Sequence, residues 1–179
     1  MAANIAVPTS LPDYFDLYGL APGFHPDANA VRKRFYELSR QHHPDRAGGG
    51  DAAAQIVALQ LTAQVNEGYR LFRNPDALMG YILKRERVVE EEEAYQLPPD
   101  FLMEMMDLNE TIVDAKTAPD MQSEAERQAA AAFGEWETSA NPLMERYDGG
   151  ERSPELLAAL KDAYYRRKYL LRIQEQLRS

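Results

Sequence analysis

The chain of 179 residues contains no cysteine, and this absence excludes several functions at once. Without thiols the chain can form no disulfide bond and can hold neither zinc nor an iron–sulfur cluster through thiolates. No apolar run is long enough to cross a membrane. No serine stands in a recognisable nucleophile motif. The absences therefore argue against disulfide-rich, thiolate–metal and membrane-spanning proteins.

Length and composition are those of one or two ordinary globular domains, with 45% hydrophobic and 27% charged residues. The first dozen residues show neither the basic-then-apolar order of a secretory signal nor the arginines of an organellar presequence. We therefore expect a cytoplasmic location. With only three histidines and no cysteine, we also expect neither a metal site nor a cofactor.

Charge is divided unevenly between the two halves of the chain. Residues 1–87 carry 10 basic and 9 acidic side chains, whereas residues 88–179 carry 10 and 20. The change occurs at the run Glu90 to Glu93, which is followed by Pro98-Pro99. Successive glutamates repel one another and prolines interrupt regular structure, so we expect a linker at 88–99 between domains at 1–87 and 100–179. The acidic second half argues against nucleic-acid binding.

Residues 27–42 predict an amphipathic helix with a basic face. Its apolar residues Val31, Phe35 and Leu38 recur at helical spacing. The other side of the helix carries Arg32, Lys33, Arg34, Tyr36 and Arg40, with Glu37 as the acidic residue nearby. Such a face is able to steer and hold an acidic partner surface. The alternative is a solvated helix face, which is what most charge clusters are.

The triplet His43-Pro44-Asp45 is expected at the tip of an antiparallel helical hairpin. Pro44 lacks an amide donor and disfavours the α conformation at His43, so the first helix should end near His42. After three glycines, Asp51 should cap a second helix that runs to about Arg73. The apolar residues of this second helix are expected to pack against the first helix. They are Ile56, Leu59, Leu61, Val65, Tyr69 and Phe72.

Three other interpretations compete for the same triplet. A zinc site built from His42 and His43 with His25 or Asp45 is disfavoured, because adjacent histidines on a turn seldom point at one metal. A His–Asp catalytic pair is disfavoured because the proline splays the two side chains and no nucleophile is recognisable. An ordinary turn is the simplest interpretation if the triplet is taken alone. The neighbouring motifs decide against it.

Motifs on both sides of the triplet extend the pattern over residues 12–82. They are Asp13-Tyr14-Phe15 with Leu17 and Gly19-Leu20, then His43-Pro44-Asp45-Arg46, and finally Val65-Asn66-Glu67-Gly68-Tyr69 with Asn74-Pro75 and Tyr81. This region resembles a J-domain, the module by which DnaJ-type co-chaperones engage DnaK-type ATPase chaperones. The resemblance implies that the triplet and the basic face dock on the chaperone and accelerate its ATP hydrolysis. It also implies that this chain has no enzymatic activity of its own.

The second half predicts three amphipathic helices with short connections, which favour an antiparallel three-helix bundle in an all-α protein. The first runs from Asp100 to about Thr117, the second starts near Asp120, and the third begins at Ser153-Pro154. Asn141-Pro142 either kinks the second helix or caps a short continuation. The expected seam residues are Phe101, Met105, Leu108, Ile112 and Ala115, then Ala125, Ala129, Ala132, Phe133 and Trp136, then Leu156, Ala159, Ala163, Leu170, Ile173 and Leu177.

The first helix of this bundle is more apolar than its seam requires. Leu102, Met103 and Met106 lie beside the seam, and the same face continues through Asp107, Glu110 and Asp114. An apolar patch that passes into an acidic stripe suits a docking surface, because the apolar part supplies affinity and the charges supply orientation. The alternative is that these residues are core, since a helix between two others buries more than one stripe. Periodicity leaves both open.

The run from Phe101 to Glu110 resembles the start of the C-terminal bundle in the HscB family of iron–sulfur J-proteins. In that family the bundle binds the cluster-assembly scaffold IscU, and the J-domain acts on a chaperone of the HscA type. The resemblance implies scaffold contacts for Leu102, Met103, Met106, Asp107, Glu110, Asp114 and Tyr169. We expect an adaptor between scaffold and chaperone. The alternatives are a J-protein for another client and a helical scaffold protein with a degenerate J-like loop.

Overall fold

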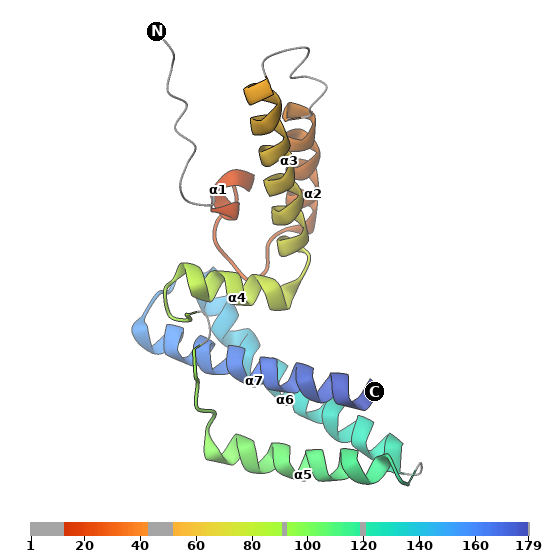
Figure 1. Ribbon diagram of the computed structural model, residues 1–179. Coiled ribbons are helices and arrows are strands. Elements are labelled where there is room, and N and C mark those ends of the chain that lie inside the picture. The colour runs from red at the N-terminus through yellow and green to blue at the C-terminus, as the bar shows by residue number, and fades with distance from the viewer. Residues whose placement is uncertain (1–12, 43–51, 91–92, 119–120, 179) are drawn as a thin grey trace. The chain divides into compact units, whose positions relative to one another are not determined.

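The structure is a computed structural model that describes residues 13–42, 52–90, 93–118 and 121–178. The described residues form seven α-helices, as expected for an all-α protein (Figure 1). The helices are α1 Tyr14–Tyr18, α2 Ala28–Gln41, α3 Ala52–Phe72, α4 Pro75–Arg85, α5 Pro99–Ala115, α6 Gln122–Asp148 and α7 Pro154–Arg178. The chain divides into two compact units between Leu78 and Met79. This division lies before the expected domain limit at residue 87, because most of α4 clusters with the second unit.

In the first unit, α2 and α3 lie side by side as the expected helical hairpin (Figure 1). The side chain of Asp27 caps α2 by accepting hydrogen bonds from the backbone N–H groups of Asn29 and Ala30. The rings of Phe35 on α2 and Tyr69 on α3 stack with their centroids 4.2 Å apart. An aromatic contact of this kind adds about 0.5–1.5 kcal/mol to the free energy of burial.

Helix α1 packs closely against the end of α3 in the same unit. The rings of Phe15 and Tyr18 meet the ring of Phe72 edge-on, with centroids 5.2 and 5.0 Å away. The Tyr18 hydroxyl donates a hydrogen bond to the carbonyl of Val65 at 2.5 Å. Burial raises the pKa of Tyr18 well above its ordinary value. Gly68 makes this approach possible, because a Cβ there would lie 2.6 Å from Cε2 of Tyr18.

The first half of α3 differs from the expected packing. Ile56 and Leu59 were expected to pack against α2, yet both side chains are more than half exposed. Val65 and Phe72 are buried as expected. Ile56 precedes Val65 by about two and a half turns, which places it on the opposite side of the helix. The sequence does not predict which of these side chains is exposed, because residues 56–59 are apolar on almost every side of the helix.

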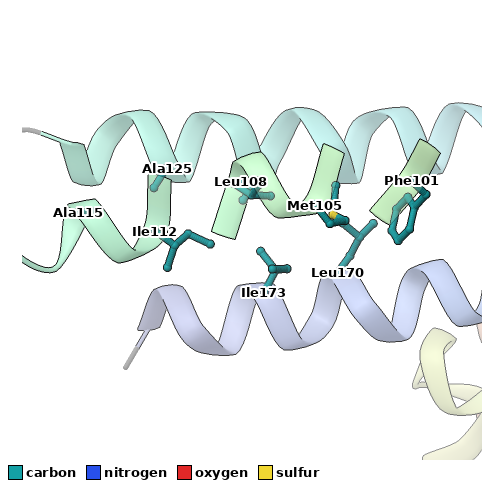
Figure 2. Packing of buried hydrophobic residues seen from close by; sticks show 9 residues of the cluster. Phe101, Met105, Leu108, Ile112, Ala115, Ala125, Leu170 and Ile173 are labelled. Atoms are coloured by element: carbon teal, nitrogen blue, oxygen red, sulfur yellow. The ribbon is translucent and has the colours of Figure 1, made fainter. Parts of the chain in front are cut away.

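In the second unit, α5, α6 and α7 form the expected three-helix bundle (Figure 1). The α5 seam is confirmed: its five expected residues are all buried and pack against residues of α6 and α7 (Figure 2). The members of this core are Phe101, Met105, Leu108, Ile112, Ala115, Ala125, Ala129, Leu170 and Ile173. In α7, Leu160 is buried while Ala159 is only half-buried, so the seam there includes a residue that the expected spacing left out.

Helix α6 continues through Pro142, which rules out the alternative that Asn141-Pro142 caps a separate short helix. Proline cannot donate to the carbonyl four residues earlier, which belongs to Thr138. Both residues are exposed, so water can reach this carbonyl. Beyond Pro142, Met144 and Tyr147 are buried and continue the packing side of the helix. Nearer the middle of α6, the indole N–H of Trp136 donates to the carbonyl of Ala163 on α7 at 2.8 Å.

The described part of the expected linker binds to α7. The carboxylate of Glu93 pairs with Lys161 and accepts a hydrogen bond from the Tyr165 hydroxyl at 3.3 Å. The ring of Tyr95 stacks on Tyr165 with centroids 4.4 Å apart, and its hydroxyl donates to Asp162 at 2.8 Å. Burial raises the pKa of both tyrosines to about 12. These contacts form a strap, defined here as residues 93–95, along α7.

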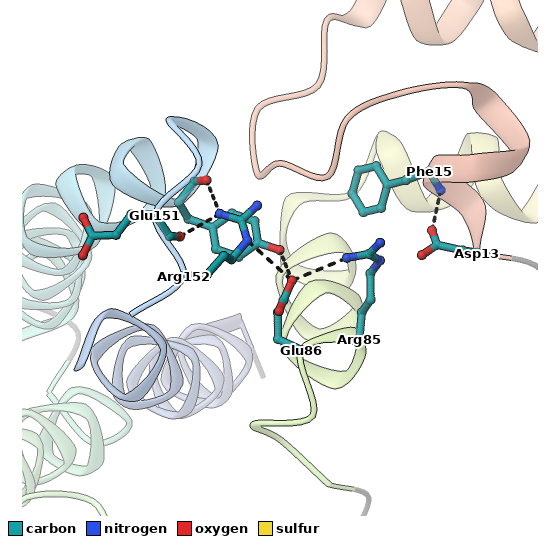
Figure 3. A network of polar contacts seen from close by, with 7 residues as sticks. Asp13, Phe15, Arg85, Glu86, Glu151 and Arg152 are labelled. Atoms are coloured by element: carbon teal, nitrogen blue, oxygen red, sulfur yellow. Dashed lines mark hydrogen bonds and ion pairs between the residues drawn. The ribbon is translucent and has the colours of Figure 1, made fainter. Parts of the chain in front are cut away.

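A second polar network lies at the end of α4 (Figure 3). The carboxylate of Glu86 accepts a hydrogen bond from the Tyr147 hydroxyl at 2.6 Å and lies 3.7 Å from the Arg152 guanidinium. Burial, followed by this hydrogen bond, raises the pKa of Tyr147 well above its ordinary value. Arg152 also lies over the Tyr147 ring, 3.3 Å from its centroid. The network joins α4 to the α6–α7 connection within the second unit.

Candidate functional site

The exposed face of α2 carries the basic and aromatic residues that the sequence analysis predicted for it. The exposed members are Arg32, Lys33, Tyr36 and Arg40. Arg34 is half-buried and pairs with Glu37 at 3.3 Å. A partly exposed pair of this kind contributes little to stability. It does neutralise Arg34, so the charge available to a partner lies on the other three cations, none of which forms an ion pair with a described residue.

The start of the loop after α2 is held by a contact that the sequence did not suggest. The hydroxyl of Thr62 on α3 lies within hydrogen-bond distance of two carbonyl oxygens, that of His42 at 3.0 Å and that of Ala58 at 2.8 Å, and shares its single proton between them. The first bond ties the C-terminal end of α2 to the middle of α3. The predicted chaperone-binding residues His43, Pro44 and Asp45 lie outside the described residues, so their role stays a prediction.

The outer face of α5 is the second candidate surface, and it is exposed. Leu102, Met103 and Met106 have exposed fractions of 42%, 65% and 61%. Phe101 and Met105, which alternate with them along the helix, are buried. The alternative interpretation, that the whole set belongs to the core, is therefore wrong. Apolar side chains left in solvent beside a complete core are typical of an interaction surface.

Acidic side chains border this apolar patch. Asp107, Glu110 and Asp114 are all exposed, and none of them forms an ion pair with a residue that the structure describes. Their spacing of three and four residues places them along one side of α5. Three carboxylates on one helix side, with no described cation paired to them, produce a negative potential that attracts and orients basic groups.

Tyr169, the remaining predicted contact, is half-buried and packs against α5. Its ring meets Phe101 edge-on with centroids 5.8 Å apart. Its hydroxyl accepts a hydrogen bond from the side-chain amide of Asn109 at 3.0 Å. The same amide nitrogen of Asn109 donates to the carbonyl of Met105 at 2.7 Å. Tyr169 thus lies at the edge of the exposed face and also holds α5 against α7, a second role that periodicity gave no means to predict.

Two features of this surface were missed by sequence reasoning. Asn109 connects α5 to Tyr169, a pairing of residues far apart in the chain that no local pattern reveals. Val113 is 63% exposed and extends the apolar side chains beyond Met106. Its position seven residues after Met106 was a usable signal, because residues seven apart lie on the same side of a helix.

The described residues contain no cluster of three or more His, Cys, Asp or Glu side chains able to hold a metal ion. None of the described helices is both long and apolar enough to span a membrane.

Comparison with known proteins identifies relatives over most of the chain. Residues 97–178 match the family model of the HSCB C-terminal oligomerisation domain. The co-chaperone protein HscB homolog of Shewanella frigidimarina is 30% identical over 167 residues, which cover 92% of this chain and 94% of the relative. The corresponding homolog of Bordetella avium is 34% identical over 133 residues, or 74% of each chain.

Solved structures show the same fold. The crystal structure of human co-chaperone protein HscB matches with a TM-score of 0.74 and 24% identity, covering 96% of this chain and 82% of that one. The chaperone HscB from Vibrio cholerae matches with a TM-score of 0.69 and 22% identity, covering 93% and 96%. At these identities the structural match is evidence for the fold.

Proposed function

The chain belongs to the HscB family of co-chaperones, and from this premise we propose that it connects an IscU-type iron–sulfur scaffold with a DnaK/HscA-type ATPase chaperone. The outer face of α5 binds the scaffold. The basic face of α2 and the loop at His43-Pro44-Asp45 act on the chaperone and stimulate its ATPase. ATP hydrolysis then tightens the chaperone on the scaffold and promotes cluster assembly or transfer.

The observation that carries the scaffold part of this proposal is the exposure of Leu102, Met103 and Met106 beside a fully buried seam. Met103 and Met106 are mostly exposed and gain little within this chain, whereas full burial of an exposed side chain of this size by a partner contributes up to about 1.5–3 kcal/mol. The adjacent carboxylates supply orientation, and methionine adapts its shape to a contact surface. A scaffold surface with apolar residues and a basic border fits this face.

The chaperone part is supported by the hairpin geometry and by Arg32, Lys33 and Arg40 on α2, three exposed cations that form no ion pair with a described residue. Long-range attraction between this face and an acidic chaperone surface accelerates encounter and fixes orientation. In this proposal the chain has no enzymatic activity and no cofactor of its own, and it works in the cytoplasm. It brings two partners together, which raises their effective concentration without requiring strong contact at either end.

The scaffold part is tested by titration calorimetry with a purified IscU-type scaffold. The native chain is compared with a Leu102→Ala, Met103→Ala, Met106→Ala variant whose helical content is checked by circular dichroism. A matched control replaces three exposed apolar residues of α3, as Ile56→Ala, Val57→Ala and Leu59→Ala. We expect the α5 variant to lose scaffold binding while the α3 control binds like the native chain.

Two other results would lead to different conclusions. If the native chain does not bind the scaffold but still stimulates a chaperone ATPase, it is a J-protein for another client. If it neither binds the scaffold nor stimulates the ATPase, it is a helical scaffold protein with a degenerate J-like loop. Single-turnover ATP hydrolysis by the chaperone, measured with and without the native chain, separates these cases.

A further inference from the structure

The exposed apolar surface of α5 extends beyond the residues to which the resemblance gives a role. Among the described residues of the second unit, the exposed large apolar side chains all belong to α5: Leu102, Met103, Met106 and Val113. Val113 follows Met106 by two turns, so both point to the same side of the helix. With Val113 included, the apolar surface is about 16 Å long, since each residue adds about 1.5 Å along the axis.

Valine is an unfavourable residue for this position if the position has no partner. Its β-branched side chain restricts χ1 in a helix and lowers helix propensity. Its exposed fraction of 63% means that it recovers little of this cost by packing inside the chain. A residue that breaks the local pattern without a gain in packing is typical of a functional surface.

Asn109 lies between Met106 and Val113 on the same side of α5, and its side chain does not prevent a continuous contact. Its amide nitrogen already donates to the Met105 carbonyl and to the Tyr169 hydroxyl. When a partner covers Asn109, this nitrogen therefore keeps its hydrogen bonds, because they are made to the protein and not to water. A polar residue inside an apolar contact surface is unfavourable when its buried polar atoms have no hydrogen-bond partner. The amide nitrogen of Asn109 has its partners, so this penalty is largely avoided here.

We propose that Val113 is part of the scaffold-binding surface, where it contacts an apolar side chain of the scaffold that has basic groups on either side. The basic groups face Glu110 and Asp114, the exposed carboxylates that lie next to Val113 along α5. This inference rests on the proposed function, because it assigns one more contact to the same partner.

Charge favours the scaffold over a second copy of this chain as the occupant of this surface. If α5 packed on the α5 of another copy, the carboxylates of Asp107, Glu110 and Asp114 would lie close to the same three carboxylates of that copy. None of them has a described cation as a partner to reduce the repulsion. A basic partner instead gains from the same charges.

The test is titration of the full chain with an IscU-type scaffold, comparing the native chain with Val113→Thr and Val113→Leu. Threonine keeps the branched shape and replaces one methyl group by a hydroxyl, so the fold should not change at this exposed position. We expect Val113→Thr to bind about fourfold more weakly, as loss of roughly one buried methyl group implies. Val113→Leu should keep the native affinity. Val57→Thr, the same change at an exposed position of α3, is the matched control and should also bind normally.

The outcomes separate this inference from the function on which it rests. If the native chain binds and Val113→Thr binds equally well, Val113 lies outside the surface, and the proposed function is unaffected. If the native chain does not bind at all, the proposed function fails and this inference fails with it. If sedimentation shows a dimer of the native chain that Val113→Thr alone abolishes, a second copy occupies the surface and the inference is overturned.

Discussion

Two glycines inside helices illustrate how individual residues depend on what surrounds them. Gly68 in α3 faces Tyr18, and a Cβ at Gly68 would lie 2.6 Å from the Tyr18 ring. This ring is buried and its hydroxyl is bonded to Val65, so it cannot move aside easily. A Cβ at Gly134 in α6 would meet no atom within 4 Å apart from its chain neighbours and its own helix backbone. The same substitution should therefore have opposite effects at the two sites.

We expect Gly68→Ala to destabilise the protein by about 1–3 kcal/mol, because overpacking a closed contact forces side chains or backbone to shift. Gly134→Ala should stabilise it by about 0.5–1 kcal/mol, because alanine removes the entropic cost of glycine in a helix. Urea unfolding followed by circular dichroism measures both. Equal effects of the two substitutions would show that the approach of α1 to α3 does not depend on Gly68.

At the scale of single helices, the sequence predicted some elements fully and others only in part. The α5 seam was predicted residue by residue because its apolar spacing alternates regularly between four and three. In the first half of α3, Ile56 and Leu59 were assigned to the wrong side, because an almost uniformly apolar stretch has no period. The exposed face of α5 was predicted as a candidate surface, but its exposure depends on how many neighbours the helix has, which no local pattern specifies.

Helix α6 offers a prediction because it carries Pro142 in its interior. Pro142→Ala restores an amide donor for the Thr138 carbonyl and removes the ring from the helix, at an exposed position where no packing is lost. We expect a gain of about 1–3 kcal/mol, measured as a higher Tm. Asn141→Ala is the neighbouring exposed control and should gain no more than about 0.7 kcal/mol, from helix propensity alone. Equal gains would mean that proline causes no specific loss here.

The strap at residues 93–95 should make stability depend on pH in a defined direction. The hydrogen bond from Lys161 is the main cause that lowers the pKa of Glu93 below its ordinary value of 4.5. A carboxyl group with a lowered pKa in the folded state stabilises the fold above its unfolded-state pKa. This contribution is lost as the pH falls through the folded-state value. It is therefore fully present at neutral pH and declines below 4.5.

We expect Glu93→Gln to lower the free energy of unfolding at neutral pH and to have a shrinking effect as the pH falls below 4.5. The measurement is urea unfolding at a series of pH values. Glu90→Gln, which changes an exposed side chain at the start of the same segment, is the control and should leave the free energy of unfolding at neutral pH unchanged. A constant gap between Glu93→Gln and the native chain at every pH would show that the ion pair with Lys161 does not stabilise the strap.

At the scale of the whole molecule, the two proposed binding surfaces belong to different compact units of one chain. The resemblance in sequence indicated both surfaces, and the charge difference between the halves placed a boundary near the acidic run. The strap was not predicted, because its contacts join residues 93–95 to Lys161, Asp162 and Tyr165, far along the chain. A run of glutamates indicates only repulsion in the sequence, because nothing local reveals that Lys161 pairs with Glu93.

If the two surfaces act independently, each function can be removed without the other. His43→Gln should bind the scaffold with native affinity in titration calorimetry and give no stimulation of the chaperone ATPase. The Leu102→Ala, Met103→Ala, Met106→Ala variant should stimulate the ATPase in the absence of scaffold and fail to bind the scaffold.

A mixture of these two variants tests whether both surfaces must belong to one chain. Single-turnover hydrolysis by the chaperone is measured with scaffold present, using the native chain, each variant and the mixture. We expect the mixture to lack the scaffold-dependent increase seen with the native chain, because neither variant tethers both partners and the gain in effective concentration disappears. Full recovery in the mixture would show instead that scaffold binding and ATPase stimulation are separate activities that need no physical connection. The linked arrangement of the two units would then have no part in coupling them.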